Sequence, residues 1–153
     1  LDLTALTQLT SVGDWFLYDC SSLASLNLTP LACLTKVGHM FLSYCFRLTT
    51  LALNPHAHIT SVGDWFLSRC ERLTTLDLPL VHLTSVGQMF LCLCSGLTAL
   101  DLTPLAHLAK VGAGFLYGCS GLTAMDLSVL EGRDNEHDEG GLDGFDWNGK
   151  PSP

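Results

Sequence analysis

The chain repeats itself every 24 or 25 residues, and this period limits the folds that it can adopt. Five glycines recur at separations of 25, 25, 24 and 25 residues: Gly13, Gly38, Gly63, Gly87 and Gly112. A Phe stands three residues after each of these glycines, a Cys seven residues after and a Leu ten residues after. A unit of this size cannot bury its own apolar face, so the copies are expected to stack into a solenoid.

The copies differ in length and completeness. Five of them begin at Leu1, Leu26, Leu51, Leu76 and Leu100, and a sixth, Met125-Asp126-Leu127, breaks off. The fourth copy is one residue short, because the single Pro79 stands where the repeat pattern has Thr-Pro.

Each repeat contains two segments that are predicted to be extended. The alternation of Leu26 and Leu28 with polar neighbours predicts a strand with one buried face. A second short segment, from Leu9 to Val12, ends at the repeat's glycine. The strands of successive repeats are then parallel and about 4.8 Å apart.

The segment after the glycine shows a different period. Phe16, Cys20 and Leu23 lie at i, i+4 and i+7, which predicts one or two helical turns with an apolar face turned inward. Asp14 and Asp64 stand just before these segments and are interpreted as N-caps.

Composition excludes several classes of protein. With 48% hydrophobic residues the body of the chain is not intrinsically disordered, and no apolar run reaches the roughly 18 residues of a membrane span. The net charge of −8 argues against nucleic-acid binding, which needs a basic surface to displace counterions from phosphates.

The charge is concentrated at the C-terminal end. Residues 131–153 hold seven acidic against two basic residues and collect Gly and Pro, whereas residues 1–130 hold eight against five. We therefore predict a solenoid over residues 1–130 and a flexible acidic Gly/Pro-rich tail over residues 131–153, because such a tail cannot offset its ordering entropy by burial.

The pattern L-x-x-L-x-L followed by V-G-x-x-F-L-x-x-C-x-x-L resembles the leucine-rich repeat in its BspA-like variety. The resemblance covers residues 1–130 and is close from Leu83 through Phe90 to Cys94 and Leu97. It implies an α/β repeat solenoid with a parallel strand face, and no catalytic residues. Members of this family are mostly cell-surface adhesion and recognition proteins of bacteria and protists.

The cysteines and histidines also follow the repeat. Five of the seven Cys occupy the inward column next to Phe and Leu, and we predict that these are buried, reduced thiols rather than disulfides or metal ligands.

His58, His82 and His107 share one turn position with Gln8 and Cys33. Two of these His could share a transition metal, but a solvated turn is the favoured interpretation, so no metal or cofactor is predicted. The family resemblance implies that the protein is located at the cell surface, whereas a column of reduced Cys favours an intracellular location. The sequence therefore leaves the cellular compartment undecided.

The outward position between the two strand leucines is the best candidate for a binding surface. Its members and their polar neighbours are Asp2, Asn27, Thr50, Thr75, Asp77, Asp101 and Asp126. By the period of a strand these side chains point away from the core and form an acidic ladder that fits a protein partner with a basic patch. The sequence therefore predicts non-catalytic protein recognition, and no enzyme. The alternative is a structural segment of a longer solenoid that continues into further repeats.

Overall fold

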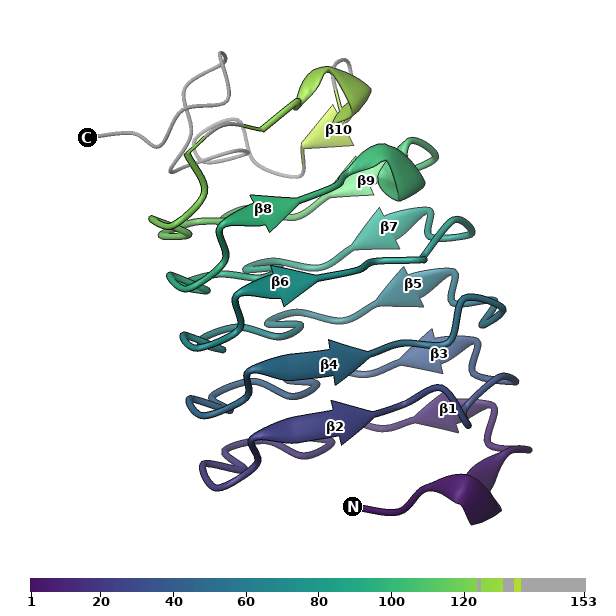
Figure 1. Ribbon diagram of the computed structural model, residues 1–153. Coiled ribbons are helices and arrows are strands. Elements are labelled where there is room, and N and C mark those ends of the chain that lie inside the picture. The colour runs from purple at the N-terminus through teal and green to yellow at the C-terminus, as the bar shows by residue number, and fades with distance from the viewer. Residues whose placement is uncertain (124, 131–133, 136–153) are drawn as a thin grey trace.

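The computed structural model describes residues 1–123, 125–130 and 134–135 of the 153-residue chain. Each repeat forms one coil of a parallel β-solenoid, and the coils stack in sequence order (Figure 1). The predicted solenoid of stacked repeats with parallel strands is confirmed. The predicted tail lies outside the described residues, apart from the backbone of β10 (Asp134–Asn135).

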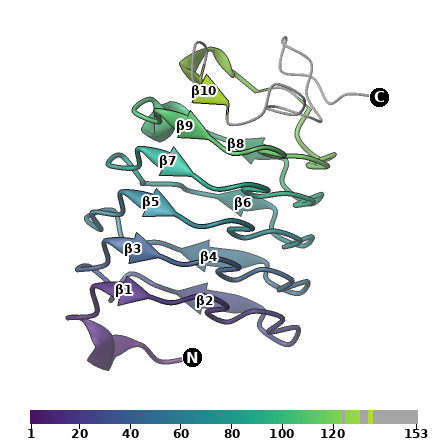
Figure 2. The same cartoon turned by 180° about the vertical axis from the view of Figure 1, so that it is seen from behind.

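Two walls of short strands enclose the core. The back wall is one six-stranded parallel sheet, seen in Figure 2, made of β1 (Ser11–Val12), β3 (Lys36–Val37), β5 (Ser61–Val62), β7 (Ser85–Val86), β9 (Lys110–Val111) and β10. The front wall consists of two separate parallel pairs, β2 (Ser25–Asn27) with β4 (Thr50–Ala52) and β6 (Thr75–Leu76) with β8 (Ala99–Leu100). In the described part of the chain, three 3₁₀ turns follow front-wall positions: η1 (Thr4–Leu6), η2 (Thr103–Leu105) and η3 (Ser128–Leu130).

A stack of phenylalanine rings runs through the core. The inward Phe of each coil lies 5.2–5.3 Å from the next, measured between ring centroids, with the rings 4–10° from parallel. Phe41, Phe66, Phe90 and Phe115 are almost completely buried, whereas Phe16 in the first coil is half-buried. The predicted inward face of the repeat is therefore correct.

The helical turns predicted after each glycine are wrong. The backbone there alternates in handedness instead, with positive φ angles at every second residue: in the first coil Trp15 (64°), Leu17 (52°) and Asp19 (51°). The N–H groups of the positive-φ residues donate alternately to the following and the preceding coil, as in the bonds from Met40 N to Asp64 O (2.8 Å) and from Leu42 N to Phe16 O (2.9 Å). These bonds between coils compensate for a conformation that L-residues normally avoid.

The predicted N-caps act on the next coil and not on their own. Asp14 Oδ1 accepts a hydrogen bond from the backbone N–H of His39, and Asp64 Oδ1 accepts one from Gln88, both at 2.8 Å. In the second coil His39 occupies the same repeat position, and its Nδ1 accepts a hydrogen bond from the N–H of Asp64 in the third coil at 3.0 Å. This position therefore forms a ladder of side-chain acceptors that ties successive coils together.

The repeat's glycine is required by the close approach of neighbouring coils. A Cβ atom at Gly63 would lie 2.7 Å from the carbonyl carbon of Gly38, and one at Gly112 would lie 2.4 Å from that of Gly87. Because both neighbours are backbone atoms, the coils could not remain this close with any other residue.

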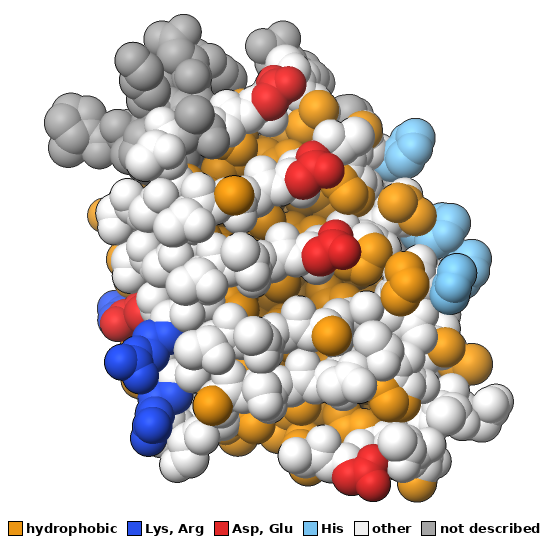
Figure 3. Space-filling model, in the orientation of Figure 1, with side chains coloured by type: hydrophobic (Ala, Val, Ile, Leu, Met, Phe, Trp, Pro, Cys, Tyr) orange, Lys and Arg blue, Asp and Glu red, His pale blue; other side chains and the backbone are white. Residues whose placement is uncertain are grey.

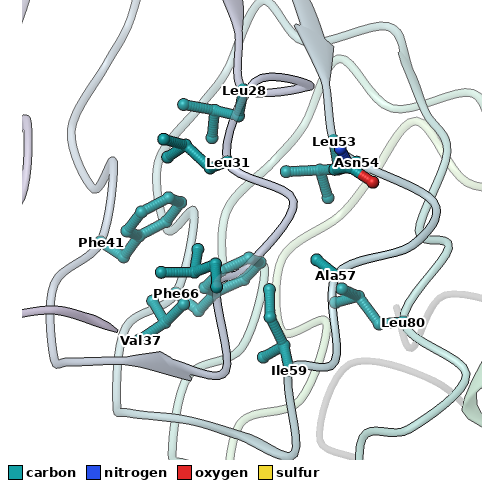
Figure 4. Close-up of a pocket in the computed structure, with 11 residues that line it drawn as sticks. Leu28, Leu31, Val37, Phe41, Leu53, Asn54, Ala57, Ile59, Phe66 and Leu80 are labelled. Carbon is teal, nitrogen blue, oxygen red and sulfur yellow. The ribbon is translucent and has the colours of Figure 1, made fainter. Parts of the chain in front are cut away.

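A small cavity of about 20 Å³ lies among the second, third and fourth coils (Figure 4). In the third coil His56 stands where the neighbouring coils place the buried Leu31 and Leu80. His56 turns to solvent, and the small side chain of Ala57 is buried in its place, which leaves the cavity unfilled.

Candidate interaction surface

The front wall presents its alternate side chains to solvent. In β2 and β4 the central leucine is buried while both flanking residues are exposed. All seven residues predicted for the binding surface are exposed: Asp2, Asn27, Thr50, Thr75, Asp77, Asp101 and Asp126. Figure 3 shows acidic side chains along this face, with hydrophobic surface between them. Their outward orientation follows the prediction, and their part in binding remains a proposal.

Most of these acidic and amide side chains also hold the turn that follows. The Oδ1 atom of Asp2 accepts from the N–H of Thr4 at 2.9 Å, and that of Asp101 accepts from Thr103 at 2.8 Å. Two further pairs repeat the arrangement: Asn27 with Thr29, and Asp126 with Ser128, each at 2.9 Å from the backbone N–H. The column therefore consists largely of Asx turns, a structural role that sequence reasoning missed.

These hydrogen bonds change the acidity of the carboxylates. The pKa of Asp101 is lowered by its hydrogen bonds with Thr103, and that of Asp126 by its hydrogen bonds with Ser128. The pKa of Asp2 is likewise lowered, chiefly by the backbone N–H of Thr4. These three side chains accordingly stay ionised at neutral and mildly acidic pH.

Asp77 is the exception in the column. The residue two positions after it is Pro79, which has no N–H to donate. Within the described residues the Asp77 carboxylate has no hydrogen bond or ion pair, and its side chain is exposed. The shorter fourth repeat therefore leaves one carboxylate of the front wall with its full capacity to accept hydrogen bonds.

The unpaired carboxylate lies beside a second one. Asp77 and Asp101 line the same open depression on the front wall, together with Thr75 and Ala99. Thr75 is the register partner of Ala99 in the β6–β8 pair, so the two aspartates are on adjacent coils. By contrast, Asp2 is separated from this pair by the coils that carry Asn27 and Ala52.

The Cys column belongs to the core and not to this surface. Cys45, Cys70, Cys94 and Cys119 are buried free thiols, and Cys20 in the first coil is half-buried. Each buried Sγ lies 3.0–3.2 Å from a backbone carbonyl of the preceding coil. Burial raises the pKa of Cys45 to about 11 and that of Cys70 to about 12, so these thiols are protonated and unreactive in the folded protein.

An aromatic cluster at the edge of the solenoid was not predicted. Trp15 meets Tyr18 edge-on at 4.9 Å, and Tyr18 lies 5.3 Å from Tyr44, both measured between ring centroids. The guanidinium of Arg69 lies 5.3 Å from the centroid of the Tyr44 ring, at cation–π distance. The sequence shows Trp15 directly before the core Phe, but the repeat pattern does not indicate its contact with Tyr18 or the contact of Tyr18 with Tyr44.

The stacked coils, the hydrogen bonds between residues one repeat apart and the continuous back wall define a leucine-rich-repeat solenoid. Residues 2–123 match the model of the BspA-type leucine-rich repeat region, in six copies, and the chain belongs to this family. Leucine-rich repeats are typically non-enzymatic modules of protein interaction. No helix in the described part of the chain is long and apolar enough to cross a membrane.

Comparison with solved structures supports the same fold. The crystal structure of a leucine-rich repeat protein of T. pallidum is similar, with a TM-score of 0.65 and 20% sequence identity. The match covers 75% of this chain and 50% of the T. pallidum chain, so it spans about half of that protein. A search of curated protein sequences found no significant match.

Proposed function

We propose that this protein is a non-catalytic recognition module that binds a protein partner through its acidic front wall. The observation that carries the proposal is the pair formed by Asp77 and Asp101 on adjacent coils, in one open depression. Their like charges repel each other, and a Lys or Arg of the partner placed between them would relieve this repulsion.

Within the pair the two aspartates have different parts. Asp101 already accepts the N–H of Thr103, whereas both carboxylate oxygens of Asp77 are available. Asp77 can therefore accept a bidentate hydrogen bond from an arginine, and Asp101 adds charge next to it. Thr75, exposed on the same depression, offers a hydroxyl to the rim of the contact.

The test measures binding to an array of synthetic peptides that carry two Arg at varied spacing, with Glu-for-Arg versions of the same peptides. The protein should retain Arg peptides and not Glu peptides, and retention should weaken at high ionic strength. The double variant Asp77→Asn with Asp101→Asn should lose this retention yet remain folded, because an Asn at this position still accepts the turn N–H, as Asn27 does.

The matched control is Asp19→Asn, which removes one exposed acid from the edge of the solenoid instead of the front wall. It should leave peptide binding unchanged. Retention of Arg peptides by the double variant, with an unaltered salt dependence, would remove the front wall as the recognition surface.

A second candidate is a structural segment of a longer solenoid. It is favoured by the apolar surface of the first coil, where Leu1 is 70% exposed, Leu6 is 42% exposed and Phe16 is half-buried. Additional repeats stacked on this coil would cover these side chains. Adding one consensus repeat before Leu1 should then raise the melting temperature, and an unchanged melting temperature would argue against this role.

A further inference from the structure

Two histidine rings lie face to face on the edge where the front wall turns toward the back wall. The ring centroids of His58 and His82 are 4.3 Å apart and their planes are 13° from parallel. Both side chains are exposed, on the third and fourth coils respectively. Figure 3 shows histidines gathered on this edge, away from the acidic side chains of the front wall.

We propose that His58 and His82 together bind a divalent transition-metal ion of the Zn²⁺, Ni²⁺ or Cu²⁺ class. Metal–nitrogen bonds to imidazole are about 2.0–2.1 Å long, so two nitrogens on one ion lie about 3–4 Å apart. A ring separation of 4.3 Å places both imidazoles within reach of that distance. In the stacked arrangement the two ring planes are nearly parallel, so the nitrogen lone pairs, which lie in those planes, do not converge on one point. Metal binding therefore requires the rings to rotate until one nitrogen of each faces the ion, and this rotation is open to them because both rings are exposed and the terminal torsion of histidine has a broad minimum.

The donor set selects this class of ion. Imidazole nitrogen suits zinc, nickel and copper, whereas Mg²⁺ and Ca²⁺ prefer oxygen ligands. Across the described residues no group of three or more His, Cys, Asp or Glu could hold a metal, so the protein supplies two ligands and water supplies the others. Such an open site exchanges its ion readily and leaves positions for an outside ligand.

The position of the pair gives the metal a structural effect. The front wall is interrupted between β4 and β6, which belong to separate strand pairs. His58 lies on the coil of β4 and His82 on the coil of β6, so one ion bound by both would bridge the two coils at this interruption. Metal binding should therefore stabilise the whole solenoid, since an ion that binds only the folded state adds its binding free energy to stability.

The experiment titrates the full chain with ZnCl₂ and separately with NiCl₂, by isothermal calorimetry and by thermal melting. We expect one ion per chain, a rise in melting temperature with metal, and binding that weakens on acidification as protons compete for the imidazoles. The variants His58→Gln and His82→Gln should each weaken metal binding by at least about tenfold. Changing a residue that only supports a metal ligand already costs about 10- to 100-fold in affinity, and these variants remove a ligand itself.

The matched controls are His107→Gln, in the same turn position one coil further, and His56→Gln, two residues before His58. Both should bind metal as the parent chain does. Equal metal affinity in His58→Gln, or loss of binding in His107→Gln alone, would overturn the proposal. Melting of each variant without metal separates a change in folding from a change in binding.

Discussion

The thiol of Cys70 donates to the backbone carbonyl of Leu42 in the preceding coil, with the sulfur 3.2 Å from the oxygen. Leu42 is one of the residues with positive φ, and the same relationship joins Cys45 to Leu17 and Cys94 to Leu67. The inward Cys thus fills core volume and also satisfies a carbonyl that the alternating backbone turns toward it.

We expect Cys70→Ala to destabilise the fold by about 1–3 kcal/mol, because it leaves the buried carbonyl of Leu42 without this donor. Urea unfolding of the parent and the variant measures the difference. The exposed Cys33→Ala is the control and should change stability little. If both variants unfolded at the same urea concentration, the bond from Cys70 to Leu42 would have no energetic significance.

The raised pKa values of the buried thiols of Cys45 and Cys70 predict a loss of stability in alkali. Below the ordinary thiol pKa of 9.0 both of these thiols are protonated in the folded and in the unfolded state. Above it the unfolded chain ionises first, since burial raises the folded pKa of Cys45 to about 11 and of Cys70 to about 12, so stability falls between about pH 9 and 12. The free energy of unfolding, measured by denaturant titration at several pH values in this range, should fall less steeply with pH in the double variant Cys45→Ala with Cys70→Ala than in the parent. A slope identical to that of the parent would mean that other groups cause the loss.

Phe66→Ala should destabilise the protein by about 3–5 kcal/mol through the cavity that it leaves. Phe66 is stacked on both sides, by Phe41 at 5.3 Å and by Phe90 at 5.2 Å. Phe16→Ala is the comparison, because Phe16 is half-buried and stacks on Phe41 alone. Chemical denaturation should rank Phe66→Ala well below Phe16→Ala in stability, and the reverse order would contradict the stack as the main support of the core.

Filling the cavity beside Ala57 should stabilise the protein. Ala57→Val adds two methyl groups next to the space bordered by Leu31 and Leu80 and is expected to contribute about 0.5–2 kcal/mol (Figure 4). Ala32→Val is the same change at the equivalent position of the second coil, where the side chain is exposed, and should be neutral. Differential scanning calorimetry distinguishes them, and a lower melting temperature for Ala57→Val would indicate overpacking instead.

The two aspartates of the front-wall pair should differ in their effect on folding. Asp101→Ala removes the acceptor for the N–H of Thr103 and should lower the melting temperature at neutral pH. Asp77→Ala removes no such bond and relieves repulsion, so it should leave the melting temperature equal or slightly higher. The effect of Asp101→Ala should diminish in strong acid, because its lowered pKa means that the stabilising carboxylate is lost there. Equal effects of the two variants would contradict the distinction.

The parts of the fold that could be predicted are those that depend on burial. The period that aligns Phe66 with Phe41 and Phe90 identifies the core stack, and the alternation in β2 identifies its exposed face. The helical turns were predicted wrongly because the spacing of Phe16, Cys20 and Leu23 fits a helix equally well. The choice between a helix and the observed alternating backbone depends on hydrogen bonds to residues one repeat away, such as Leu42 N to Phe16 O. These bonds have no local signature in the sequence.

The candidate surface shows the same limit. Strand period placed Asp77 and Asp101 on the outside, and both are exposed. The difference between them depends on whether the residue two positions later has an N–H. Pro79 was visible in the sequence, but its importance requires the Asx turns of the neighbouring coils, which only the structure shows.

The short fourth repeat shows that the two walls tolerate a change in loop length independently. One codon fewer between Leu78 and Leu80 leaves the back wall in register, with Ser61 opposite Ser85 and Val62 opposite Val86. The same missing codon brings Pro79 to the position after Leu78 and so releases the carboxylate of Asp77. A loop that joins the two walls can thus differ in length by one residue and alter the chemistry of the exposed face, while the register of the stacked strands is kept.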